Sequence, residues 1–139
     1  MSKPVTRIMF DTNVLVSAIL NARGAPSRAL LKAAESSCVL VLCDQILDEL
    51  RRIYNSKFPL RIPDMERFLS IAQYDLVVLT AEDVIATDEE AIRDIDDRSI
   101  LRAARKVGVD ILVTGDKDFL DSPIKNPRIM TVADYLEMC

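Results

Sequence analysis

Residues 7–20 set the pattern for the whole chain and read Arg7-Ile8-Met9-Phe10-Asp11-Thr12-Asn13-Val14-Leu15-Val16-Ser17-Ala18-Ile19-Leu20. The mainly apolar run at 7–10 predicts a short β-strand. Residues 14–20 are apolar on nearly all sides, which is typical of a helix packed beneath a sheet. Asp11 directly follows the predicted strand. This stretch therefore predicts a buried strand that carries a carboxylate at its end.

The same alternation continues along the chain. Further apolar runs predict strands at 39–42, 76–79, 110–113 and 128–130, and amphipathic segments predict helices at about 26–36, 44–53, 63–72, 96–107 and from 132 onward. Strands separated by helices imply a parallel sheet with right-handed crossovers. Because the chain has 139 residues and only three glycines, we expect a single domain over residues 1–139.

Composition excludes several kinds of chemistry. The chain has no histidine, so a Ser-His-Asp triad, a Cys-His dyad and an imidazole zinc site are ruled out. The longest purely apolar run, 38–43, is too short to cross a membrane. Three cysteines without a C-x-x-C pair, and no leader-like start, predict a cytoplasmic protein. With 22 acidic and 18 basic residues, the net charge of −4 does not by itself suggest a nucleic-acid binder.

Four acidic residues are the candidate site: Asp11, Glu49, Asp97 and Asp116. Any one of them alone could be a helix cap, a turn residue or a solvated side chain. If the first and fourth predicted strands are neighbours, however, Asp11, Asp97 and Asp116 converge on one edge of the sheet. Carboxylates without cysteine or histidine suit Mg²⁺ or Mn²⁺, and a metal-activated water is then the expected nucleophile for phosphodiester hydrolysis.

Four motifs, in order along the chain, resemble those of the PIN domain family of metal-dependent ribonucleases. They are residues 10–18 (FDTNVLVSA), 46–50 (ILDEL), 97–104 (DRSILRAA) and 113–119 (VTGDKDF). The resemblance implies a three-layer α/β/α sandwich with a five-stranded parallel sheet. It also implies that Asp11, Glu49, Asp97 and Asp116 are the catalytic, metal-binding acids. Asn13 and Thr114 match polar helpers, Asp118 matches an additional acid, and Asp96 could share the role of Asp97.

The resemblance further implies an RNA substrate and, for this branch of the family, the toxin role in a toxin–antitoxin pair. A cognate antitoxin and a homodimer are then expected partners. Basic residues that could grip the RNA backbone lie beside the Glu49 helix: Arg51, Arg52, Lys57 and Arg61. A second basic stripe consists of Arg98, Arg102 and Arg105, whereas the acid-rich residues 84–97 are expected to repel RNA.

The residues leave two other classes of function open. One is a PIN-like module that binds RNA or a protein without turnover. The other is a phosphoryl-transfer protein on a similar parallel sheet, with Asp11 as a nucleophile. Aspartyl phosphatases of that kind need a second Asp two positions later, and this chain has Asn13 there.

Overall fold

The computed structural model describes residues 5–138 and contains one five-stranded sheet. The strands are β1 (Thr6–Phe10), β2 (Cys38–Cys43), β3 (Tyr74–Val77), β4 (Ile111–Val113) and β5 (Arg128–Met130). Their order is β3-β2-β1-β4-β5, and every neighbouring pair is parallel. The prediction of a parallel sheet of five strands is thus confirmed.

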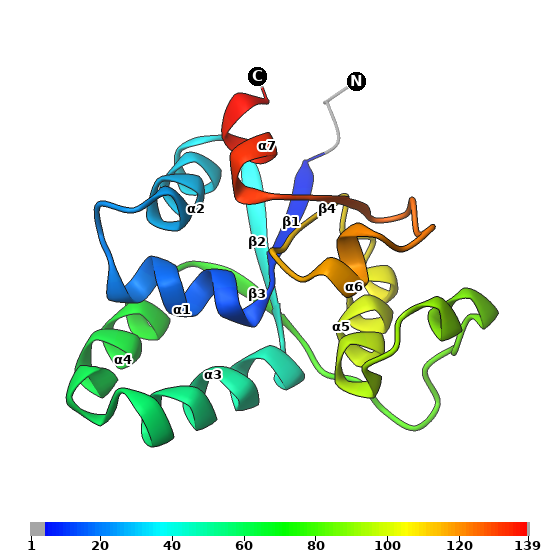
Figure 1. Ribbon diagram of the computed structural model, residues 1–139, viewed down its shortest axis with the longest axis horizontal. Coiled ribbons are helices and arrows are strands. Elements are labelled where there is room, and N and C mark those ends of the chain that lie inside the picture. Colours follow the sequence, from blue (N-terminus) through cyan, green and yellow to red (C-terminus); the bar gives the residue numbers. More distant parts are fainter. Residues whose placement is uncertain (1–4, 139) are drawn as a thin grey trace.

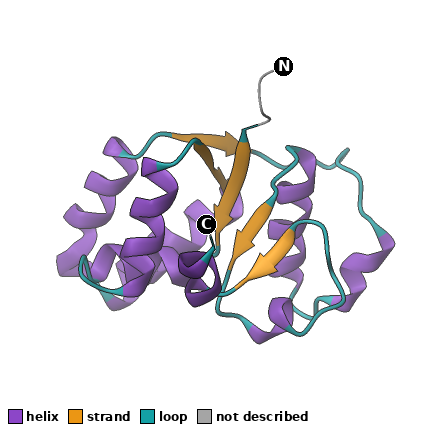
Figure 2. Cartoon of the chain, turned by 90° about the horizontal axis from the view of Figure 1, so that it is seen from above, coloured by secondary structure: helices purple, strands orange, loops and turns teal. Residues whose placement is uncertain are grey.

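The described part of the chain forms seven α-helices around this sheet. They are α1 (Thr12–Leu20), α2 (Ala25–Glu35), α3 (Asp44–Lys57), α4 (Ile62–Ile71), α5 (Ile95–Lys106), α6 (Lys117–Leu120) and α7 (Val132–Glu137), with 3-10 helices η1 (Pro59–Arg61) and η2 (Thr87–Ala91) between them. Helices α1, α2 and α4 lie on one side of the strands and α5 on the other (Figure 1), and Figure 2 shows helices flanking the sheet on both sides. The architecture is the three-layer α/β/α sandwich.

The chain order places a switch point at β1. From β1 the sheet grows one way to β2 and β3, and then the other way to β4 and β5. In sheets of this kind, ligands bind beyond the carboxyl ends of the strands where the order reverses. Phe10 pairs in register with Val113, so the residues that follow β1 and β4 start from the same edge of the sheet.

The core around this edge is fully buried. Met9 and Phe10 of β1, Leu112 and Val113 of β4, and Leu101 of α5 all have no exposed surface. A dry core beneath the switch point fixes the strand ends from which the polar residues project. In the part of the chain that the structure describes, no helix is long and apolar enough to cross a membrane.

Two details differ from the predicted elements. The third strand is Tyr74–Val77 rather than 76–79, because β2 ends at Cys43, whose register partner is Val77. The apolar spacing of the 26–36 helix predicts that Leu30, Leu31 and Ala34 point inward. In α2 the buried side chains are instead Ala29 and Ala33, and Leu30 is partly buried against the core. Leu31 is 57% exposed, so the small alanines provide the contact face and the larger leucine points outward.

Candidate functional site

Asp11 is held at the end of β1 by a dense set of hydrogen bonds. Its backbone N–H donates to the Val113 carbonyl at 2.9 Å, which ties it to β4. As the N-cap of α1, its Oδ1 accepts the Thr12 N–H at 2.8 Å, and its Oδ2 accepts the Thr114 hydroxyl at 2.8 Å. Burial raises the pKa of Asp11, although the bond from Thr114 opposes this shift. The sequence thus places a fixed, buried carboxylate at the switch point.

The loop after β4 is ordered by the same threonine. Thr114 is fully buried, and its hydroxyl oxygen accepts the Asp116 N–H at 3.0 Å while donating to Asp11. Asp116 then caps α6, since its Oδ1 accepts the Asp118 N–H at 2.9 Å. Thr114 therefore connects the acids that follow the two central strands.

Asp97 comes from the first turn of α5 and is only 7% exposed. That turn is set by Asp94, whose Oδ1 accepts the Asp96 N–H at 2.9 Å. Burial, together with the nearby negative charges of Asp11 and Asp116, raises the pKa of Asp97 to about 8. Asp96 is exposed at this turn. Of the two neighbouring acids, Asp97 is the one buried among the other carboxylates.

Glu49 is the fourth acid of the candidate site. It lies half-buried on α3, and its Oε1 accepts a hydrogen bond from the Gln45 side-chain amide at 2.9 Å. All four predicted acids line one cavity of about 260 Å³, together with Thr12, Asn13, Arg52, Ile53, Asp94 and Asp96. Asp118 does not line this cavity. It has a carboxylate oxygen within 4.8 Å of ligand atoms on Asp97 and Asp116.

This group of residues fits a hard divalent cation. Like-charged carboxylates so close together repel one another unless a cation lies between them, and oxygen ligands favour Mg²⁺ or Mn²⁺. Thr12 lines the same cavity and is 2% exposed, and its hydroxyl has no hydrogen-bond partner among the described residues. A buried orphan hydroxyl is expected where a water or ion belongs. Sequence reasoning assigned no role to Thr12, although it lies inside the first motif.

The basic residues predicted to bind the substrate lie on α3 and η1. Of these, Arg52 lines the acidic cavity. Arg51 is paired with Glu66, and Arg61 is paired with Asp64 at 2.5 Å, and the side chains of both pairs are about half exposed. Lys57 is exposed in the last turn of α3. Exposed pairs of this kind are weak, so a phosphate can compete for these bases.

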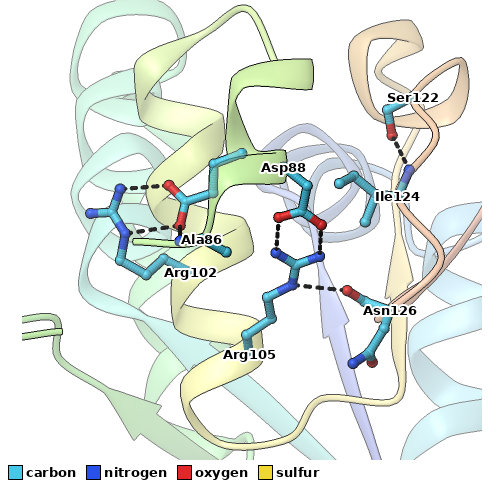
Figure 3. Close-up of polar contacts among 8 residues, drawn as sticks. Ala86, Asp88, Arg102, Arg105, Ser122, Ile124 and Asn126 are labelled. Carbon is cyan, nitrogen blue, oxygen red and sulfur yellow. Dashed lines mark hydrogen bonds and ion pairs between the residues drawn. The ribbon is translucent and has the colours of Figure 1, made fainter. Parts of the chain in front are cut away.

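The second basic stripe is committed to pairs inside the protein. Arg102 pairs with Glu89 at 2.6 Å, and Arg105 makes two bonds to Asp88 at 2.6 and 2.7 Å (Figure 3). Arg98 donates from Nε to the Ile92 carbonyl at 2.6 Å. The predicted RNA contact by this stripe is therefore not favoured. Residues 84–97, which were expected to repel RNA, hold all three of its arginines, two through the acids Asp88 and Glu89 and one through the Ile92 carbonyl.

Known proteins resemble this chain in sequence and in fold. The family model described as "PIN domain" matches residues 7–118. An uncharacterized protein of Methanocaldococcus jannaschii is 29% identical over 126 residues, covering 86% of this chain and 77% of that protein. The fold is similar to the crystal structure of VapBC2 from Rickettsia felis bound to a DNA fragment from their promoter, with a TM-score of 0.68 and 19% identity over 91% of this chain and 98% of that chain. The chain belongs to the PIN domain family.

Proposed function

We propose that this protein is an endoribonuclease that hydrolyses RNA phosphodiester bonds with the help of Mg²⁺ or Mn²⁺, in a single PIN-like domain spanning residues 1–139. The observation that carries the proposal is the convergence of Asp11, Glu49, Asp97 and Asp116 on one cavity at the switch point of the sheet. Members of the PIN family are generally nucleases, which supports the reaction class.

The proposed ligand set is Asp11, Glu49, Asp97 and Asp116, with Asp118 and Asp96 beside it. A divalent ion bound there would act as a Lewis acid on the phosphate and generate a nucleophile at neutral pH. The chain itself supplies rigidity: Thr114 and the Thr12 N–H each hold one oxygen of Asp11, so its carboxylate needs little reorganisation. Asn13 is exposed at the mouth of the cavity, where its amide can orient a polar group of the substrate.

RNA binding is assigned to the α3 side of the cavity. Arg52 lines the cavity, and Arg51, Lys57 and Arg61 extend the basic surface from α3 into η1. Phosphate contacts of this kind provide affinity without sequence selectivity. In this proposal the acidic net charge of −4 is no obstacle, because bound cations and a local basic surface make the contact with RNA.

The biological setting that we propose is the toxin role of a toxin–antitoxin pair in the cytoplasm, with an antitoxin and a homodimeric partner. The fold likeness to VapBC2 supports the setting, and the free thiols of Cys38 and Cys43 fit a reducing compartment. The test is inducible expression in a bacterial host. Growth arrest that Asp11→Asn abolishes supports the toxin role, and unaffected growth at high expression contradicts it.

The enzymatic proposal is tested by incubating a structured RNA with the protein in Mg²⁺, in Mn²⁺ and in EDTA. We expect cleavage in both metals and none in EDTA. Asp11→Asn should lower the rate by about 100-fold or more, because even residues behind metal ligands cost 10- to 100-fold. The matched control is Asp121→Asn, since Asp121 is an exposed acid outside the cavity. Cleavage that survives both EDTA and Asp11→Asn would rule out the mechanism.

Two other outcomes point to the remaining classes of function. RNA that is bound but left intact in Mg²⁺ and Mn²⁺ would support a PIN-like binding module. A stable adduct of beryllium fluoride on Asp11 would support phosphoryl transfer. The sequence does not favour that second class, because Asn13 stands where aspartyl phosphatases of that kind need a second Asp.

A further inference from the structure

Residues 80–94, here called the strap, connect β3 to α5 and are bound to the side of that helix. Three carboxylates of the strap face three bases of α5 in order: Asp83 pairs with Lys106 at 3.0 Å, Asp88 with Arg105 at 2.6 Å and Glu89 with Arg102 at 2.6 Å. Glu89 is 2% exposed, and its second oxygen also accepts the Ala86 N–H at 3.3 Å. The strap is therefore fixed on α5 along most of its length.

The end of the strap that approaches the acidic cavity is fixed on both sides of Arg93. Ile92 is fully buried, and its carbonyl accepts the Arg98 bond. Asp94 is the N-cap of α5 and lines the cavity. Between these anchors, the Arg93 side chain is 88% exposed. The backbone of Arg93 is thus held in place while its guanidinium remains in solvent.

Among residues 5–138, this guanidinium forms one ion pair, and its partner is the carboxylate of Asp118. Arg93 Nη2 lies 3.2 Å from Asp118 Oδ1, and Asp118 belongs to the close cluster with Asp97 and Asp116. Arg93 is the single basic residue of residues 80–97. The fold therefore places Arg93 at the rim of the acid cluster as a single base, and not as part of a wider basic surface.

These features suit recognition of a phosphate. An exposed pair at 3.2 Å contributes little, so Arg93 loses little when it leaves Asp118. A guanidinium makes two parallel bonds to a phosphate, and a backbone that is already ordered lowers the entropic cost of doing so. Arg52 enters the cavity from α3, so a strand crossing the acids would meet one arginine from α3 and another from the strap.

We propose that Arg93 is a substrate-binding residue whose guanidinium exchanges Asp118 for a phosphate of the RNA backbone beside the scissile bond. This inference rests on the proposed function and adds a residue that the sequence motifs do not include. It also revises the expected role of residues 84–97: most of the strap faces α5, and its exposed arginine faces the substrate.

The test measures both RNA binding and RNA cleavage for the wild-type protein, Arg93→Ala and Arg93→Lys. Binding is followed by fluorescence anisotropy of a labelled single-stranded RNA in Ca²⁺, over a series of salt concentrations, and cleavage is followed in Mg²⁺. The matched control is Arg128→Ala. Arg128 is an exposed arginine that begins β5, so it lies at the amino end of the sheet, away from the cavity.

For Arg93→Ala we expect RNA affinity to fall about 5- to 10-fold, and the slope of log K against log salt to decrease by about 0.7, as for one lost phosphate contact on a single strand. KM should rise while kcat changes less than about twofold. Arg93→Lys should recover part of the affinity, because it keeps the charge and loses the paired geometry. The midpoint of thermal unfolding should not move, since the pair with Asp118 is exposed.

Unchanged affinity and salt slope in Arg93→Ala, or an equal loss in Arg128→Ala, would overturn the role of Arg93 while cleavage by the wild-type protein leaves the nuclease proposal standing. RNA that the wild-type protein binds but never cuts would overturn the nuclease proposal, and a selective loss in Arg93→Ala would then still support the contact. A wild-type protein that neither binds nor cuts RNA would overturn both.

Discussion

Helix α5 lies beside two groups of carboxylates, one without basic partners and one with them. At its first turn, Asp97 joins Asp11 and Asp116 in a cavity where no base of the described residues pairs with them. Along its later turns, α5 presents a base to each of three strap acids, Asp83, Asp88 and Glu89. The carboxylates at the first turn of α5 therefore have no basic partner among the described residues, whereas the strap carboxylates along its later turns are each paired with a base.

The pKa values follow this division. Burial raises the pKa of Asp11 and of Asp97. In the strap, the Thr80 N–H and Lys106 lower the pKa of Asp83, and the two bonds from Arg105 lower that of Asp88. Carboxylates that the fold has already paired need nothing more. Carboxylates that are buried without a base call for a cation from outside the chain, and this contrast favours the cavity over the strap as the functional site.

The largest effect is expected from breaking the buried end of the strap. Glu89→Ala leaves Arg102 without its partner. Because the side chains of Glu89 and Arg102 are only 2% and 21% exposed, the free energy of unfolding should fall by about 3 kcal/mol. Chemical denaturation measures this loss. The control is Glu90→Ala, because Glu90 is an exposed neighbour, and it should change stability by less than about 0.5 kcal/mol. Equal effects of the two variants would mean that the buried pair does not hold the strap.

The second-largest effect is expected from adding a cation, which distinguishes the acids of the cavity from those of the strap. Mg²⁺ at about 100 times its dissociation constant should raise the free energy of unfolding of the wild-type protein by about 2.7 kcal/mol. Asp116→Asn should lose most of this gain because it removes one of the proposed metal ligands of the cavity. Asp88→Asn should keep it, since Asp88 is already paired with Arg105. Thermal unfolding with and without the metal gives the comparison, and a gain that survives Asp116→Asn would place the cation elsewhere.

A smaller effect of opposite sign is expected inside the cavity without metal. Asp97→Asn removes a buried negative charge beside Asp11 and Asp116, so the metal-free protein should become about 1 kcal/mol more stable at pH 8. The pKa of Asp97 is about 8 in the folded protein and about 4 when unfolded, so between these values the folded state binds more protons. Wild-type stability should therefore fall as pH rises from 4 to 8.

The Asp97→Asn profile should be flatter over that range, because the variant lacks the group that titrates. Circular dichroism during thermal unfolding in EDTA, at several pH values, measures both profiles. Ser99→Ala is a suitable control, since it changes the same helix without changing charge. A wild-type profile that rises with pH between 4 and 8 would contradict the crowding of carboxylates in the cavity.

The cavity acids could be predicted from the sequence because strand ends are easy to recognise. Asp11 and Asp116 each follow an apolar run, and parallel strands bring their carboxyl ends to one edge. Asp97 lies in the first turn of an amphipathic helix, and the family resemblance was needed to prefer it to Asp96. Glu49 was harder to place from periodicity, since it only avoids the buried stripe of its helix, and the family resemblance added a motif at residues 46–50 that contains it.

The strap could not be predicted in the same way. Residues 80–94 have no helical or strand period, so nothing in the sequence says that Glu89 meets Arg102 or that Arg93 reaches Asp118. The bases of α5 looked free because their partners come from a loop folded back on the helix. Charge patterns show that charges are present, but pairing across a loop depends on tertiary structure.

The smallest effect concerns the exposed part of the strap and its pH dependence. Asp88 and Arg105 form two bonds at 2.6 and 2.7 Å, but their side chains are 49% and 23% exposed, so Asp88→Asn should lower stability by less than about 1 kcal/mol and less still in high salt. Arg105 keeps its bond to the Asn126 carbonyl at 2.9 Å, which limits the loss (Figure 3).

Pairing with Arg105 lowers the pKa of Asp88. The contribution of this pair to stability is therefore complete above the ordinary pKa of an aspartate and disappears as the pH falls below it. Acid should therefore weaken the strap pair only below the ordinary pKa of Asp88, whereas it relieves the cavity at higher pH, between about 8 and 4. A difference between wild-type and Asp88→Asn stability that grows on acidification would contradict this assignment.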